Sequence, residues 1–205
     1  MEIILKEEIG GKTLSIQTGK VAKQASGSVV VQYGDTMVLV TVVSTHDARP
    51  GDFVPLTVEY QEKIYAAGKI PGGFFKRERG MTEREVLSSR FIDRALRPLF
   101  PDGYRDETQV TAQVLSADRD YDTDVLAFVG ASAAVMISDV PFPAPIAAVR
   151  VSRVDGKLIA NGTLAEIDAA DLNIIVAGSR DALVMVEGGA KQVSEAAVLE
   201  ALRFG

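Results

Sequence analysis

Hydrophobic and polar residues alternate in short runs through the first sixty residues, a pattern typical of β-strands. Glycine-containing pairs separate these runs. Because glycine adopts positive φ without a steric penalty, each pair predicts a hairpin turn. The predicted strands are residues 3–9 and 13–17 around Gly10-Gly11, residues 28–33 and 36–44 around Gly34-Asp35, and residues 56–61. The run at 36–44 is rich in β-branched residues, so we place it in the centre of the sheet.

The middle of the chain changes to a helical pattern. Thr82-Glu83-Arg84-Glu85 has the form of a capping box, so a helix should begin here and continue to Arg97. Pro98 should end it, because proline disfavours the helical conformation in the residue before it. Residues 123–138 form a long run of small and apolar residues that predicts a buried helix.

The second half of the chain returns to strands. They are predicted at residues 108–116, 146–153, 157–160, 172–177 and 182–187, and a helix is predicted at 194–204 with Ser194 as its cap. Runs of strands with a few helices between them indicate an α/β or α+β fold. No repeat or low-complexity linker divides the chain, so we treat residues 1–205 as one domain. Its last residues fall within a predicted helix, and we expect the domain to be a fragment of a longer chain.

Composition excludes several classes of function. The chain has no cysteine, which excludes disulfides and thiol catalysis, and a single histidine leaves almost no material for a histidine-rich metal site or a Ser-His-Asp triad. No apolar run reaches the roughly 18 residues expected of a membrane span. The first residues carry acidic side chains where a signal peptide would be basic. We therefore expect a cytoplasmic protein that does not enter a membrane.

One segment departs from the overall charge. The chain has a net charge of −6, whereas residues 69–97 contain eight basic and four acidic residues. Within this segment Phe74 and Phe75 directly precede Lys76 and Arg77. Aromatic rings stack on unpaired bases and cations bind the phosphates between them, so the pattern predicts a site for single-stranded RNA. The alternative is that both rings belong to the core.

The predicted helix continues the basic segment. Arg90, Arg94 and Arg97 fall within about 60° of one another on a helical wheel, on one face of the helix. Two interpretations remain open for this stripe. It contacts phosphates, or its arginines form internal salt bridges, for which Asp93 is placed one turn from Arg97.

Three segments together resemble a known family. They are FVPLTVEYQEKIYAAGKIPGGFFKRERG, SSRFIDRALRPLFPDGY and VLAFVGASAAV, and they are similar to the first ribonuclease-PH-like domain of the polynucleotide phosphorylase family. The resemblance extends over essentially the whole chain. It implies a ribosomal-protein-S5-domain-2-like α/β sandwich. It also implies a longer protein that forms a homotrimeric ring and degrades single-stranded RNA from its 3′ end by phosphorolysis, releasing nucleoside diphosphates.

The resemblance also implies a binding site. In the family, the loop that corresponds to Phe74, Phe75, Lys76 and Arg77 lines the entrance of a central channel and grips RNA. This chain has Lys76 where the family commonly has arginine, and it inverts the order of the glycine and arginine at Arg79-Gly80. The predicted RNA-binding residues are Phe74, Phe75, Lys76, Arg77, Arg79, Arg90, Arg94 and Arg97.

No catalytic or metal-binding residue is assigned to this domain. In the family, the second ribonuclease-PH-like domain binds phosphate through a serine cluster and Mg²⁺ through an aspartate pair. The corresponding stretches here are Asp122-Thr123-Asp124, whose carboxylates would repel phosphate, and residues 165–171, where only Asp171 remains of the pair. We therefore expect Mg²⁺ and phosphate to bind in the second domain.

Other functions fit the sequence less well. Asp118, Asp120, Asp122 and Asp124 alternate as in a calcium loop, but the required glycine and glutamate are missing, and we interpret the segment as a solvated acidic turn. A self-sufficient phosphorolytic ribonuclease would need the serine cluster and the aspartate pair. A non-enzymatic RNA-binding module is the remaining alternative.

Overall fold

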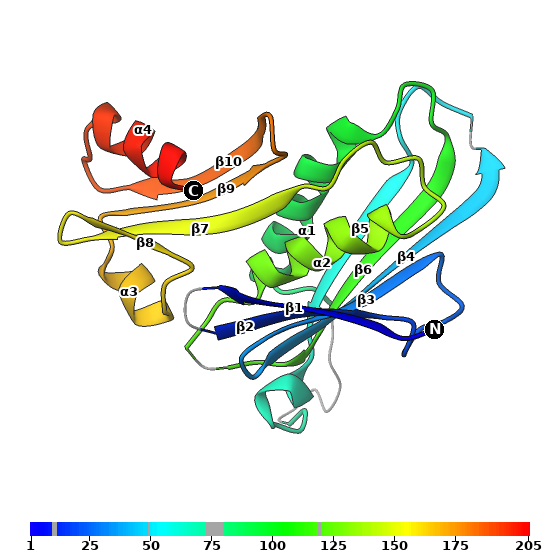
Figure 1. Cartoon of the computed structure of the whole chain (residues 1–205), viewed down its shortest axis with the longest axis horizontal. Coiled ribbons are helices and arrows are strands. Elements are labelled where there is room, and N and C mark those ends of the chain that lie inside the picture. The colour runs from blue at the N-terminus through cyan, green and yellow to red at the C-terminus, as the bar shows by residue number, and fades with distance from the viewer. Residues whose placement is uncertain (10–11, 49, 73–79, 119) are drawn as a thin grey trace.

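The computed structural model describes residues 1–9, 12–48, 50–72, 80–118 and 120–205, and these stack in layers (Figure 1). A six-stranded sheet is followed by two helices, a four-stranded sheet and a last helix. The strands are β1 (Ile3–Ile9), β2 (Lys12–Thr18), β3 (Gly27–Tyr33), β4 (Thr36–Ala48), β5 (Leu56–Glu62), β6 (Asp106–Ser116), β7 (Ala147–Val154), β8 (Lys157–Ala160), β9 (Leu172–Gly178) and β10 (Leu183–Ala190). The helices are α1 (Glu83–Leu96), α2 (Asp124–Met136), α3 (Leu164–Ala169) and α4 (Glu195–Phe204), with 3-10 turns η1 (Ile64–Ala67) and η2 (Arg97–Leu99).

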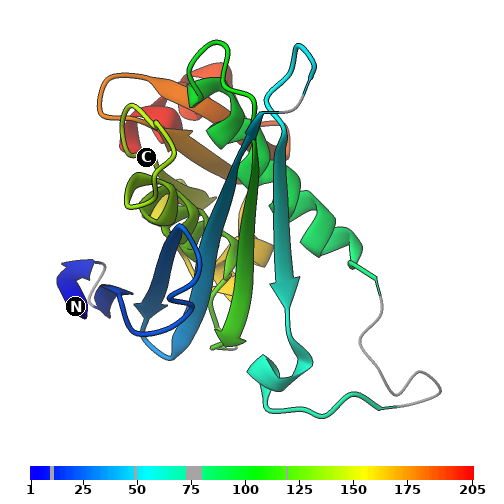
Figure 2. The same cartoon turned by 90° about the vertical axis from the view of Figure 1, so that its right-hand side faces the viewer.

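The six-stranded sheet has the order β1-β2-β3-β4-β6-β5. Its neighbouring strands are antiparallel except for β5 and β6, which run parallel. A parallel pair needs a long crossover, and here helix α1 lies within it. The interior position predicted for residues 36–44 is confirmed, because β4 pairs with β3 on one side and β6 on the other. Strand β5 forms one edge of the sheet (Figure 2).

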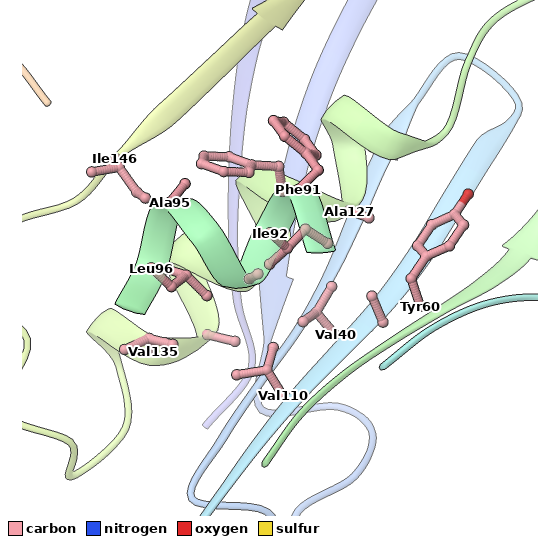
Figure 3. Close-up of a cluster of buried hydrophobic side chains, with 14 of the residues drawn as sticks. Val40, Tyr60, Phe91, Ile92, Ala95, Leu96, Val110, Ala127, Val135 and Ile146 are labelled. Carbon is pink, nitrogen blue, oxygen red and sulfur yellow. The ribbon is translucent and has the colours of Figure 1, made fainter. Parts of the chain in front are cut away.

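The main core lies between this sheet and helices α1 and α2. Val40 and Val110 project from the sheet toward Phe91, Ile92 and Leu96 of α1 (Figure 3). Because these side chains are at most a few per cent exposed, they account for much of the burial that stabilises the fold. The predicted capping box of α1 is present, so the start of this helix is fixed by its own sequence.

Close packing of α2 depends on a glycine. A Cβ added at Gly130 would lie 2.6 Å from Val40 Cγ2 and 3.1 Å from Val31 Cγ2. Only glycine therefore lets this buried helix approach β3 and β4 so closely. The four-stranded sheet, in the order β10-β9-β7-β8, covers the other side of the helices, and α4 packs on its far face through a second core cluster.

The predicted strands and helices are present, and the α/β class is confirmed. The sequence prediction missed α3, although Thr163 and Glu166 form a second capping box at its start. Helix α1 ends at Leu96, one residue before the predicted end at Arg97. Pro98 lies in the 3-10 turn η2 that follows. No helix among the described residues is long and apolar enough to cross a membrane.

Candidate functional site

The structure places the predicted RNA-binding residues in two groups. Phe74, Phe75, Lys76, Arg77 and Arg79 lie outside the described residues. They belong to the connection from β5 to α1, which leaves the sheet at its edge (Figure 2). The other three, Arg90, Arg94 and Arg97, lie on α1 or directly after it, and their surroundings differ from one another.

Arg97 is bound within the protein. Its Nε donates to Asp93 Oδ2 at 2.9 Å, and its Nη2 lies 2.5 Å from Asp93 Oδ1. Its guanidinium also donates to the backbone carbonyls of Val54 at 2.7 Å and Leu56 at 3.0 Å. These bonds use both edges of the guanidinium, so the geometry favours the interpretation of Arg97 as an internal strut that fixes the end of α1 against the start of β5.

Arg94 and Arg90 face outward. Arg94 makes an ion pair of 3.2 Å with Glu187 on β10, and both side chains are largely exposed. Exposed pairs of this kind contribute little to stability. Arg90 is exposed and has no hydrogen-bond or ion-pair partner within the described part of the chain. With Asp93 and Val58 it borders a hollow of about 330 Å³ beside β5.

A second group of charges lies between the helices and the four-stranded sheet, and its centre at Arg150 and Asp124 is largely buried. Arg150 projects from β7 and its side chain is only 11% exposed. Its Nη2 lies 3.1 Å from Asp122 Oδ2 and 2.5 Å from Asp124 Oδ2. Arg84, in the first turn of α1, also donates to Asp122. Two carboxylates at the start of α2 thus hold two arginines from other elements.

The electrostatics follow from this burial. The pKa of Asp124 is raised to about 6, because burial and then the neighbouring Asp122 raise it more than Arg150 lowers it. Burial lowers the pKa of Arg84, but Asp122 and Glu62 outweigh it and the net pKa is raised. The solvated acidic turn expected from the sequence is therefore wrong for Asp122 and Asp124. Asp124 is buried and Asp122 is half-buried, and both belong to an ion-pair network because Arg84 of α1 and Arg150 of β7 converge on them.

The network continues to the edge strand β5. The Tyr60 hydroxyl donates to Glu62 Oε1 at 2.7 Å and also contacts the Thr123 hydroxyl. Burial, and then the Glu62 carboxylate, raise the pKa of Tyr60. A hollow of about 440 Å³ opens over the network. Its lining includes Arg84, Phe91, Asp122, Asp124, Arg150 and Glu187.

This arrangement has a chemical consequence. A phosphate dianion needs uncommitted donors or cations, as in charge-assisted contacts with arginine. Here Arg84 and Arg150 are already bound to carboxylates of the same chain. The hollow therefore lacks the chemistry of a phosphate cradle.

The residues also do not fit Mg²⁺. Asp171 accepts two hydrogen bonds from Arg153, at 2.8 and 2.5 Å, and these bonds lower its pKa. Within the described ranges, no three aspartate, glutamate, histidine or cysteine side chains converge on a point that could hold a metal. No reaction step is assigned to a metal in this chain.

Sequence reasoning named Asp122, Asp124 and Arg84, but it missed Arg150 and Glu62, which complete the network. Arg150 was not singled out, although it is an arginine in the otherwise apolar start of a predicted strand, AAVRV. An arginine at a buried strand position needs a carboxylate or carbonyl partner, but the sequence does not say which of the acidic residues supplies it. No local pattern marked Glu62, because its role depends on how β5 packs beside α1.

Two segments match a known family. Residues 10–141 match the 3′ exoribonuclease family, domain 1, and residues 144–205 match domain 2 of the same family. The main core cluster includes side chains from both segments, among them Phe128 from the first and Ile175 from the second.

Similar proteins support the same family. The polyribonucleotide nucleotidyltransferase of Desulfatibacillum aliphaticivorans is 61% identical over 207 residues, covering 100% of this chain and 29% of that protein. The corresponding enzyme of Geotalea uraniireducens (strain Rf4) is 58% identical, covering 100% of this chain and 30% of its own length. The chain thus spans less than a third of these relatives, and the family resemblance predicted from the sequence is confirmed.

Solved structures share the fold. A chain of the Archaeoglobus fulgidus exosome, solved with RNA bound to the active site, superposes with a TM-score of 0.72 at 19% identity. The match covers 99% of this chain and 83% of that chain. The ribonuclease-PH-like architecture predicted from the sequence is confirmed.

Proposed function

The chain belongs to the 3′ exoribonuclease family, and on that premise we propose that it is the RNA-guiding, ring-forming N-terminal unit of a polyribonucleotide nucleotidyltransferase. The full-length protein would degrade single-stranded RNA from its 3′ end by phosphorolysis and release nucleoside diphosphates. The names of relatives similar over the whole chain support this activity. The self-sufficient enzyme and the non-enzymatic module find no comparable support.

One observation carries the assignment of a guiding role. Arg84 and Arg150, the cations around the network hollow, are neutralised by Asp122 and by the buried Asp124. Cleavage by phosphate requires a bound phosphate near the scissile bond, and this hollow presents carboxylates instead. We therefore place the phosphate and Mg²⁺ of the full-length enzyme in another part of the protein.

RNA contact is assigned to the basic segment. Phe74 and Phe75 would stack on bases, while Lys76, Arg77 and Arg79 would bind phosphates. Of Arg90, Arg94 and Arg97, we propose Arg90 as a phosphate contact, because it is exposed and unpaired among the described residues. Arg94 would have to release Glu187 first, and Arg97 would have to leave its internal bonds. A homotrimeric ring in the cytoplasm is part of the same proposal.

The test is RNA affinity in the full-length enzyme. Phe74→Ala and Phe75→Ala should each weaken binding of a fluorescein-labelled oligoadenylate by about 1–3 kcal/mol for every stacked base lost. Phe53→Ala is the matched control, because Phe53 is 68% exposed in a different loop and is not part of the proposed site. Fluorescence anisotropy gives the dissociation constants.

Unchanged affinity for both variants, with the thermal unfolding of each variant also unchanged, would remove the two rings from the RNA path. An equal loss with Phe53→Ala would show that any exposed phenylalanine contributes non-specifically.

A further inference from the structure

A cavity of about 320 Å³ lies beside helix α2, between the β1–β2 hairpin and strand β7 (Figure 1). Val125 and Val129 are four residues apart on α2, so they share one face of that helix and line the cavity together. The hairpin contributes Ile9 and Leu14, and β7 contributes residues 147–149. Small-molecule sites in proteins begin at about 300 Å³, so this cavity has the size of one.

Two tyrosines form an aromatic wall of the cavity. The rings of Tyr33 and Tyr121 meet edge to face, with their centroids 6.1 Å apart. The Tyr33 hydroxyl donates to the backbone carbonyl of Ile9 at 2.8 Å, and burial, followed by Tyr121, raises its pKa. Lys12 Nζ lies 3.8 Å from the centre of the Tyr121 ring and 3.6 Å from Asp118 Oδ2. Because other residues hold both rings, the wall is present without a ligand.

The lining suits an apolar body better than water. Protein interiors contain few voids larger than a water molecule, because apolar groups that face a void lose contacts. A water in a cavity needs two to four polar partners. Here the aliphatic side chains and the two rings make up most of the walls, and the buried Leu126 extends them toward the main core. An apolar ligand therefore gains contacts that water does not.

The charges of the lining indicate an uncharged ligand. Among the described lining residues, the charged ones are Asp122 and Arg150, and they pair with each other at 3.1 Å. Arg150 is also bound to Asp124. An ion in the cavity would lose its hydration without meeting a free counter-charge, which costs far more than burying a neutral group.

Asn161 gives the cavity a hydrogen-bond donor. It follows β8 with a φ of +49°, a left-handed conformation that asparagine tolerates. Its backbone N–H donates to the Arg150 carbonyl at 2.7 Å, and its Oδ1 accepts the Arg150 N–H at 3.0 Å. With Oδ1 engaged, the side-chain NH₂ remains as a donor, and it has no hydrogen-bond partner among the described residues. A ligand that satisfies this donor carries an acceptor atom.

We propose that this cavity binds a small, uncharged aromatic heterocycle. Its ring packs between the tyrosine wall and the valines of α2, where aromatic pairs gain more than their buried area alone provides. Its acceptor atom takes a hydrogen bond from the Asn161 NH₂ group. The site shares no residue with the RNA contacts proposed above, so either assignment stands or fails without the other.

The experiment titrates the full-length enzyme with 6-fluoroquinoline at mildly alkaline pH, where this heterocycle is uncharged, and follows binding by fluorine NMR. Val129→Phe fills the cavity from α2 and should weaken binding by about tenfold or more. Val86→Phe is the matched control, because Val86 lies on another helix, is 41% exposed and does not line the cavity. Its affinity should stay within about twofold of wild type.

A second probe tests the hydrogen bond. 2-Fluoronaphthalene has the same ring shape as the first probe but no acceptor atom. Asn161→Asp keeps an oxygen for the Arg150 N–H and removes the amide donor. It should weaken 6-fluoroquinoline binding about fivefold, the effect of one net hydrogen bond, and change 2-fluoronaphthalene binding by less than about twofold.

Three results would overturn the proposal. Wild-type enzyme that binds neither probe at millimolar concentration, or that binds them no better than Val129→Phe, has no ligand site in this cavity. Equal losses for Val129→Phe and Val86→Phe would show that the probe reports a general change in the protein. Equal losses of both probes in Asn161→Asp would contradict the acceptor and with it the ligand class. Ala148→Leu, which fills the cavity from β7, provides a second route if Val129→Phe folds poorly.

Discussion

The network around Arg150 and the outer face of α1 hold the same kind of side chain with different partners. In the network, Arg84 and Arg150 are bound to Asp122, and Arg150 also to Asp124. On the outer face, Arg90 is exposed and unpaired among the described residues. Among the arginines compared here, the one available to an anion is therefore the one without a carboxylate partner in the described part of the chain.

The two regions also differ in what their charges contribute. A buried pair that loses one partner leaves an uncompensated charge in a medium that solvates it poorly. An exposed arginine that is removed leaves water in its place, so the fold loses little. Structural and binding roles should therefore separate cleanly when arginines of the two regions are replaced.

The largest effect is expected for Arg150. Arg150→Met leaves Asp122 and the buried Asp124 without their shared partner, and it should lower the free energy of unfolding by about 3–5 kcal/mol. Urea unfolding at neutral pH measures this change. Arg180→Met is the control, because Arg180 is exposed in the turn between β9 and β10, and its effect should stay within about 0.5 kcal/mol. Similar effects at both positions would contradict the comparison.

A smaller effect is expected for Asp124, and it depends on pH. Its pKa is raised from 3.8 to about 6 in the folded chain, so the folded state binds the proton more tightly than the unfolded state. The resulting stabilisation is fully present below about pH 4 and is lost as the pH rises through about 6.

Between about pH 7 and pH 5 the wild-type chain should gain about 1 kcal/mol relative to Asp124→Asn, which has no such proton to bind. The measurement is the difference between their free energies of unfolding across this range. Asp102→Asn, at an exposed loop position, should instead follow the wild type. Parallel curves for wild type and Asp124→Asn would show that Asp124 does not take up this proton.

Local patterns in the sequence predicted most of the fold. Alternation, glycine turns and the Thr82 capping box gave the strands and α1, since each depends on residues close in the chain. The short helix α3 was missed although Thr163 and Glu166 carry the same capping signal, because six residues give little periodicity to read. Helix and strand assignment therefore succeeded where several local signals agreed.

The candidate site was less predictable, because its contacts join distant segments. Asp122 and Arg150 lie 28 positions apart, and the bond from Glu62 to Glu85 spans 23. No local pattern could show that the alternating aspartates would meet β7, or that the edge of β5 would bind α1. The sequence likewise left open whether Arg97 binds inward, and its bonds to Val54 and Leu56 depend on the packing of α1 beside β5.

The smallest expected effect concerns two arginines of the α1 region, Arg90 and Arg97, and the salt dependence of RNA binding. If Arg90 contacts phosphate in the full-length enzyme, Arg90→Ala should flatten the dependence of log affinity on log salt by about 0.7, the value for one contact with single-stranded nucleic acid. Arg97→Ala should leave this slope unchanged and lower the melting temperature, because it breaks bonds to Asp93 and to two backbone carbonyls.

The two variants thus test whether Arg97 stabilises the fold while Arg90 binds RNA. Both lose one positive charge from one region of the surface, so a general change in electrostatic attraction would affect their slopes alike. A slope that changes only for Arg90 assigns a phosphate to that side chain. A slope unchanged for both would remove Arg90 and Arg97 from the phosphate contacts and would leave residues 74–79 and Arg94 as the proposed RNA contacts. A slope changed for Arg97 alone would mean that its internal bonds open when RNA binds, which would contradict the separation of roles argued from their partners.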